Sequence, residues 1–162
     1  MDDESLRDQV RSTLLRALQE AGLEVEQVGA DRWVTQLSGE HKRSIPVLLV
    51  LDERSLKVAS LLARAPDEGH EEVYRVLLRR NRHPLPVHFA IDDDGDLVLR
   101  GALPLVAVDE RAVDELLGTV LALCDETFNE VLRVGFAGYL DAEQRWRAKV
   151  GLPPNPVGDA EP

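Results

Sequence analysis

Sulfur-containing and aromatic residues are scarce in this 162-residue chain, which has one cysteine, one methionine, two tryptophans, two tyrosines and three phenylalanines. Because Cys124 is the single cysteine, an internal disulfide and a metal site built from several thiolates are both excluded. Cys124 also lies in the apolar stripe of a predicted helix. We therefore interpret it as a buried, unreactive thiol rather than as a nucleophile.

Long apolar runs are absent too, and none approaches the roughly 20 residues that a membrane-spanning helix needs. The first residues, Met1-Asp2-Asp3-Glu4, are acidic where a secretory signal would be basic and then apolar, so we expect a cytoplasmic protein. Basic residues are outnumbered, with 19 Lys and Arg against 30 Asp and Glu and a net charge of -11. This balance argues against binding to nucleic acid or to an anionic membrane surface.

Hydrophobic residues make up 44% of the chain, which is enough for the core of one domain. The most informative stretch is a predicted antiparallel hairpin over residues 87–103. Facing residues of such a pair must point to the same side of the sheet. A three-residue loop at 93–95 meets this condition because it pairs Phe89 with Leu99 and gathers the apolar residues on one face. We expect Gly95 to adopt the left-handed conformation in this loop.

Apolar spacing and turn residues predict the remaining elements. Three strands are expected at residues 33–37, Ile45–Leu51 and 56–62, and helices at 3–21, 70–81, 109–136 and 141–150. The resulting fold is α+β, with a five-stranded antiparallel sheet in the order α-β-β-β-α-β-β-α and the first and last long helices on one face. We expect this domain to occupy residues 1–138, followed by a helical extension at 139–150 and a disordered Pro/Gly-rich tail at 151–162.

This element order, the Asp-Gly hairpin that enters a long helix, and the step Leu-Arg-Arg-Asn at residues 78–81 before a Pro-flanked strand resemble the YbjN-domain family. The resemblance covers roughly residues 4–136. It implies the α+β fold of the CesT-type type III secretion chaperones and a small bacterial cytoplasmic homodimer that binds protein segments or acts as an accessory regulator. Members of the family are described as sensory transduction regulators, a description that names no reaction.

Motifs that carry chemistry are weak in this sequence. The run Asp92-Asp93-Asp94-Gly95-Asp96 does not have the spacing of a calcium-binding EF-hand loop, so we interpret it as a solvated turn. The four histidines, His41, His70, His83 and His88, show no zinc-binding spacing. Nucleotide-binding and hydrolase motifs are also absent. We therefore expect no catalytic residue, no cofactor and no metal.

The strand Ile45–Leu51 is nearly all apolar, although a sheet covered on one face does not need both of its faces apolar. We expect either a partner's apolar segment on the free face or along an edge strand, or a second subunit covering these residues. The candidate partner-binding residues are Trp33, Val47, Leu49, Arg75, Arg79 and Trp146. Both tryptophans have an equally good interpretation as core or dimer contacts.

The arginines at positions 75, 79, 80 and 82 allow two interpretations: a site for phosphate or an acidic peptide, or a solvated helix end paired with neighbouring acidic residues. We conclude from the sequence that the chain is a non-enzymatic, homodimeric protein-binding module whose partner is an unknown protein. The alternatives are a small-ligand binder or enzyme that uses a cavity between elements, and a regulator that recognises nucleotide or nucleic acid through the arginines.

Overall fold

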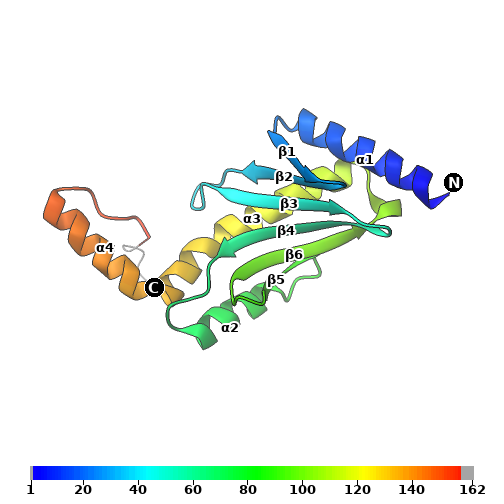
Figure 1. Ribbon diagram of the computed structural model, residues 1–162. Helices are drawn as coiled ribbons and strands as arrows, with labels where there is room; N and C mark the ends of the chain where they lie inside the picture. The colour runs from blue at the N-terminus through cyan, green and yellow to red at the C-terminus, as the bar shows by residue number, and fades with distance from the viewer. Residues whose placement is uncertain (1, 158–162) are drawn as a thin grey trace.

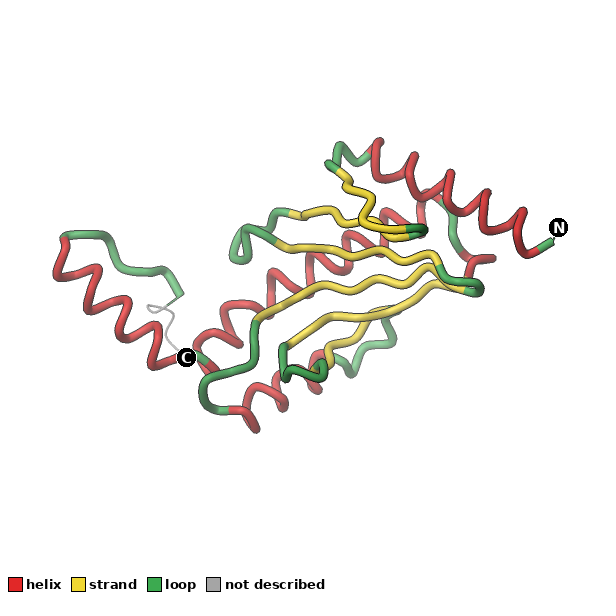
Figure 2. Tube along the Cα trace, viewed as in Figure 1, coloured by secondary structure: helices red, strands yellow, loops and turns green. Residues whose placement is uncertain are grey.

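A computed structural model describes residues 2–157 of the chain (Figure 1). One helix precedes four strands, and a second helix separates these from two further strands and the C-terminal helices (Figure 2). Their bounds are α1 (Asp3–Glu20), β1 (Val25–Gly29), β2 (Arg32–Leu37), β3 (Ile45–Leu51), β4 (Ser55–Ala63), α2 (His70–Arg80), β5 (Val87–Ile91), β6 (Leu97–Pro104), the 3-10 turn η1 (Leu105–Ala107), α3 (Glu110–Gly135) and α4 (Ala137–Val150).

The sheet has six strands in the order β1-β2-β3-β4-β6-β5, and every neighbouring pair is antiparallel. The α+β class is confirmed, but the expected count of five strands was wrong because it missed β1. This strand, Val-Glu-Gln-Val-Gly, lies at an edge, and three of its five residues are exposed. It buries no side chain fully, so it lacks the apolar alternation that identifies a strand in a sequence.

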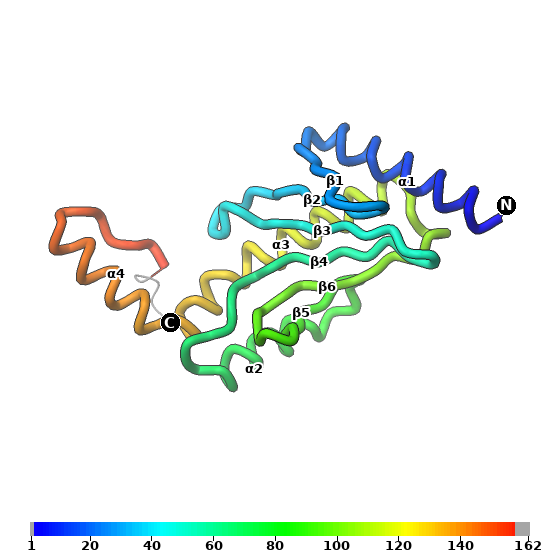
Figure 3. The backbone as a smooth tube through the Cα atoms, in the orientation of Figure 1, coloured from blue at the N-terminus to red at the C-terminus, as the bar shows by residue number. Residues whose placement is uncertain are grey.

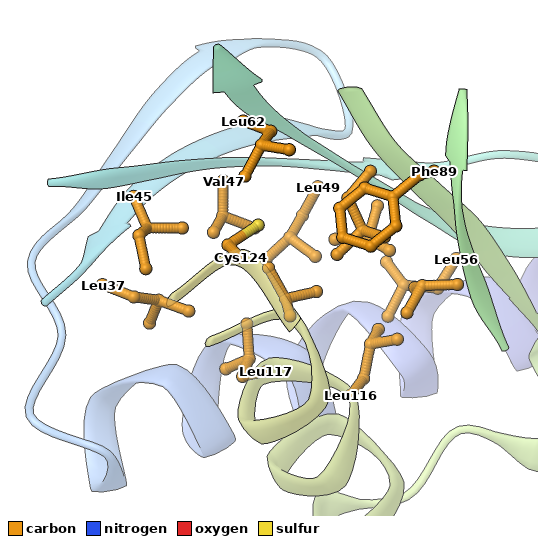
Figure 4. Close-up of a cluster of buried hydrophobic side chains, with 14 of the residues drawn as sticks. Leu37, Ile45, Val47, Leu49, Leu56, Leu62, Phe89, Leu116, Leu117 and Cys124 are labelled. Carbon is orange, nitrogen blue, oxygen red and sulfur yellow. The ribbon is translucent and has the colours of Figure 1, made fainter. Parts of the chain in front are cut away.

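Helices α1, α2 and α3 pack against the same face of the sheet, as Figures 1 and 3 show. Val47 and Leu49 point from β3 toward α3, where they meet Leu116, Leu117 and Cys124 (Figure 4). The core is therefore a single layer between the sheet and its helices. Among the described residues, no helix is both long and apolar enough to cross a bilayer.

The predicted hairpin is confirmed residue by residue. Phe89 faces Leu99, Ile91 faces Leu97, and Gly95 has a φ of +83°. The Asp92 carboxylate accepts hydrogen bonds from the backbone N–H groups of residues 94 and 96 at 2.9 and 3.0 Å. This carboxylate therefore holds the turn together, which supports the interpretation of the aspartate run as a turn.

Both long helices begin after an aspartate N-cap. The Asp2 carboxylate accepts from the Ser5 N–H at 2.8 Å at the start of α1. Helix α3 is capped by Asp109 and ends at Gly135, one residue before its predicted end. Its last carbonyl accepts from the N–H groups of residues 67 and 68 at 3.0 and 3.2 Å, so the loop before α2 takes the place of the next helical turn.

Helix α4 projects away from the sheet and its covering helices (Figure 3), and Leu140 alone among its residues is buried. The chain then turns back along α4. The Asn155 N–H donates to the Gln144 side chain at 2.7 Å, and the Gln144 amide donates to the Asn155 carbonyl at 2.8 Å. The expected disorder of residues 151–162 stays a prediction for 158–162, which lie outside the described residues.

We predict opposite effects for two glycine-to-alanine substitutions. At Gly101, on β6, an added Cβ would lie 2.1 Å from the Pro86 carbonyl oxygen, so G101A should lower the free energy of unfolding by about 1–3 kcal/mol. At Gly118, an exposed position inside α3, an added Cβ has no neighbour within 4 Å, so G118A should raise it by about 0.5–1 kcal/mol. Urea denaturation of both variants tests this pair, and a stable G101A protein would contradict the packing of β5 on β6.

Candidate functional site

The face of the sheet that points away from the helices is apolar at its centre, and we call it the open face. Along β3 the side chains alternate, so that positions 45, 47, 49 and 51 are buried under the helices, whereas Pro46, Leu48 and Val50 point the other way. The apolar residues of the open face are Val34, Pro46, Leu48, Val50, Ala59, Leu61 and Val98, and they line two shallow adjoining grooves. No element within residues 2–157 covers them.

Charged residues surround this apolar centre in a defined order. The strand registers place Glu26, Val34, Leu48, Ala59, Arg100 and His88 side by side in one row that crosses all six strands. The row begins with a carboxylate on β1 and ends with a guanidinium and an imidazole on β6 and β5. Neither Glu26 nor Arg100 forms an ion pair with any other described residue. Both charges are therefore available to a partner.

Three of the expected partner-binding residues belong to the core instead. Trp33, Val47 and Leu49 are 2%, 0% and 0% exposed, because all three point toward the helices. Burial argues against Val47 and Leu49 as partner contacts on the folded chain, and for Trp33 it supports the alternative interpretation as a core residue. Every residue of β3 is apolar, so the sequence does not show which alternate set faces the helices. A partner on the folded chain instead meets Pro46, Leu48 and Val50.

A second apolar surface lies between helix α2 and the edge strand β5, and we call it the α2–β5 groove. It has a volume of about 250 Å³ and is lined by Tyr74, Leu77, Leu78, Asn81, Phe89, Ala90 and Ile91. Leu78 is 69% exposed and Ile91 is 52% exposed, so water covers apolar side chains on both walls. The sequence pattern of α2 gives no sign that Leu78 would meet Ile91.

Asn81 closes the middle of the β5 edge. Its side-chain amide donates to the Phe89 carbonyl at 2.9 Å, and its side-chain oxygen accepts from the Phe89 N–H at 2.7 Å. One side chain thus replaces the pair of backbone hydrogen bonds that an added strand would make at this position. A partner in the α2–β5 groove consequently contacts side chains rather than extending the sheet through Phe89.

The arginine cluster is largely paired within the chain. Arg75 contacts Glu71 at 2.6 Å and Arg79 contacts Glu72 at 3.9 Å. Arg80 reaches across to residues 126 and 130 of α3 at 3.7 and 3.2 Å. Arg82 is exposed, lines a hollow beside the α2–β5 groove, and has no ion pair in the described part of the chain. The predicted interpretation as a paired helix end therefore suits the first three arginines better than the fourth.

Trp146 lies on α4, remote from both surfaces, and is 57% exposed. Tyr139 and Val150 are exposed on the same helix at spacings of seven and four residues from it, so the three share one stripe. The structure does not bring this stripe together with the open face or with the arginines.

The groups with potential for catalysis do not converge. The Cys124 thiol is fully buried, and burial raises its pKa from 9.0 to about 11, so it is protonated at neutral pH. His41, on the exposed loop between β2 and β3, approaches Asp125 of α3 at 3.2 Å. Burial raises the pKa of Asp125, but hydrogen bonds from the Lys42 and His41 backbones outweigh burial and hold it below its usual range. Asp125 therefore acts as an anchor for the loop. No group of three or more potential metal ligands gathers anywhere in residues 2–157.

Comparison with known proteins identifies relatives over most of the chain. Residues 11–133 match the model of the YbjN family, described as "Putative bacterial sensory transduction regulator". The uncharacterized protein Rv0487 of Mycobacterium tuberculosis is 42% identical over 118 residues, which are 73% of this chain and 64% of that protein. The uncharacterized protein ML2442 of Mycobacterium leprae is 38% identical over 123 residues, 76% of this chain and 67% of that protein. The match thus spans about two thirds of the length of these relatives.

Solved structures share the fold at low sequence identity. A chain of the heterodimeric complex ExoU–SpcU, from the type III secretion system of Pseudomonas aeruginosa, aligns with a TM-score of 0.50 and 20% identity and covers 74% of this chain and 94% of that one. A chain in the structure of the Yersinia pestis type III secretion chaperone SycH with a fragment of YscM2 aligns at 0.49 and 16% identity, over 71% of this chain and 96% of that one. The first likeness shows that this fold also occurs in a chain of that type III secretion complex.

We predict that Asn81→Ala lowers the free energy of unfolding by about 1–3 kcal/mol, because it leaves two backbone groups of Phe89 without their partners. The Phe89 amide should exchange its hydrogen faster, as NMR-detected exchange can measure. Asn155→Ala, which removes an amide from the chain end beside α4, is the matched control and should leave Phe89 unchanged. Unchanged exchange at Phe89 in the Asn81 variant would contradict the assigned role of Asn81.

We also predict that Cys124 resists a thiol reagent such as DTNB at pH 8 until the chain unfolds, when one equivalent reacts. Since the folded pKa is above the unfolded one, the buried thiol favours the folded state below pH 9. This contribution is lost as the pH rises through about 11. Rapid labelling of the native chain, at a rate independent of added urea, would show that the thiol is accessible.

Proposed function

Because this chain belongs to the YbjN family, we propose that it is a non-enzymatic protein-binding module, a chaperone-like adaptor or regulator that acts as a homodimer in the cytoplasm. The family description, a regulator of sensory transduction, supports a role exerted through binding. The fold, which also occurs in a chain of the heterodimeric ExoU–SpcU complex, is compatible with such a role.

The open face is the observation that carries the proposal. A sheet with helices on one face only is expected to alternate apolar and polar residues, with the polar set in water. Here the second set is apolar as well, from Val34 on β2 to Val98 on β6. Covering this surface removes apolar area from water, which is the main driving force of most protein association. A protein surface of this kind is what an adaptor presents to its partners.

The α2–β5 groove suits a segment of a partner protein. It is narrow, it has exposed apolar side chains on both walls, and its length follows an edge strand. We assign to it a partner segment that places apolar side chains against Leu78 and Ile91 and a carboxylate near Arg82. The unpaired guanidinium provides charge complementarity, and the apolar contacts provide most of the affinity.

The competing class, a small-ligand binder or an enzyme, finds less support in the same geometry. The groove on the open face, of about 420 Å³, and the α2–β5 groove are both open to solvent. The titratable groups of the open-face groove are Asp92 and Arg100, and those of the α2–β5 groove reduce to the phenol of Tyr74. Neither groove places a nucleophile beside a base, which acyl or phosphoryl transfer would need.

We predict that Leu78→Asp removes partner binding without unfolding the chain. The wild-type protein and the variant serve in parallel as baits in lysate of the source organism, and bound proteins are quantified by mass spectrometry. The amount of a partner that is stoichiometric on the wild type should fall by about tenfold or more on L78D, because the change removes an apolar contact and places a carboxylate beside the one that the partner brings to Arg82.

Val106→Asp is the control bait, because Val106 is 84% exposed and the same change there introduces the same charge elsewhere. It should retain the partner. Equal capture by all three baits would place the partner outside the α2–β5 groove. If no stoichiometric protein binds but a metabolite co-purifies, the small-ligand alternative replaces the proposed function.

A further inference from the structure

We propose that a second copy of this chain covers the open face, with the two sheets packed face to face around a two-fold axis that runs parallel to the strands between β3 and β4. This inference rests on the homodimer of the proposed function and names the surface and orientation that form it. The α2–β5 groove, on the helix side of the domain, stays free for a partner in this arrangement.

The order of charges across the sheet fits such a pairing. Rotation about an axis along the strands places β1 of one copy over β5 of the other, β2 over β6, and β3 over β4. In the row that crosses all six strands, Glu26 then lies over His88 of the second copy, with Arg100 of that copy beside it. Each dimer gains this acid-to-base contact twice, because a two-fold interface repeats every contact.

The alternative axis, in the same plane but across the strands, places each strand over its own copy. If that axis passes through this central row, Glu26 lies over Glu26 and Arg100 over Arg100 of the second chain, and like charges held at an interface are strongly disfavoured. The charges therefore distinguish the two ways of stacking the sheets. They favour the axis along the strands.

The side-chain sizes agree with the same axis. At the centre of the row, Leu48 of each copy lies over Ala59 of the other. Ala59 and Leu48 line both shallow grooves of the open face, so a leucine from the second copy would fill the space that the small alanine leaves. In the next row, Pro46 lies over Leu61, and in the row on the other side Val50 lies under the aliphatic stem of Lys57. No row places like charges opposite each other.

The size of the face is also sufficient. The strands contain 40 residues, each covering about 3.3 by 4.8 Å of the sheet, which gives a face of about 630 Å² per copy. Specific interfaces of standard size bury about 600–1,000 Å² on each partner. The open face is therefore large enough for a specific dimer, and sheets commonly pack face to face at about 10 Å.

The arrangement can be tested on the full chain by exchanging the charges at Glu26 and Arg100 and measuring the dimer dissociation constant by sedimentation equilibrium. The wild type should be a dimer. R100E and E26R should each weaken dimerisation by about tenfold or more, because each places like charges together. The double variant E26R/R100E should return to within about threefold of the wild-type dissociation constant. L48K, at the centre of the face, should give a monomer.

L78D in the α2–β5 groove is the matched control and should remain dimeric while it loses the partner. Protection of Cys124 from DTNB reports that each variant is folded. A wild-type dimer that L48K and R100E leave intact would overturn the inference, since the dimer would then use another surface. A double variant that dimerises no more tightly than either single variant would also overturn the inference. A monomeric wild type that still captures its partner would overturn the inference and the homodimer, but not the protein-binding function.

Discussion

The structure depends on one asymmetry, which is that three helices cover one face of a six-stranded sheet and no described element covers the other. Burial on the covered side fixes the register of β2 to β6, because a shift by one residue would exchange the buried and uncovered sets. In most antiparallel sheets that helices cover on one face only, the uncovered side chains are polar and remain in water. In this chain the uncovered side chains of β3 are those of Pro46, Leu48 and Val50. The hydrophobic effect that stabilises the core therefore also favours burial of the other face.

Much of the fold could be predicted from the sequence where a local rule decided the outcome. The parity of facing residues selected the three-residue loop of the β5–β6 hairpin, and the side-chain oxygen of Asp109 identified the start of α3. The count of strands was wrong where tertiary context decides. Strand β1 has no buried alternation, and it forms because it pairs with β2. The residues of β1 alone do not indicate this pairing.

The candidate site shows the same division. Apolarity along β3 correctly indicated a surface in need of a cover, but a strand that is apolar at every position does not show which alternate set is inside. Val47 and Leu49 were consequently chosen as partner contacts although they point into the core. The α2–β5 groove was missed because Leu78 and Ile91 come from separate elements, and only their packing makes them neighbours. Asn81, which looked like a helix end, proved to be the group that closes a sheet edge.

The two surfaces differ in shape, and their chemistry differs accordingly. The open face is broad, and its charges run from acidic on β1 to basic on β6 and β5. When two copies stack as proposed, the basic end of one therefore lies over the acidic end of the other. The α2–β5 groove is narrow and ends beside a single unpaired arginine. One surface therefore suits assembly and the other suits recognition. Hydroxyl-radical footprinting of the full chain at low and high protein concentration tests this division most directly. Leu48, Val50 and Leu61 should become protected at high concentration while Leu78 stays reactive, and equal reactivity of the open face at every concentration would contradict the account.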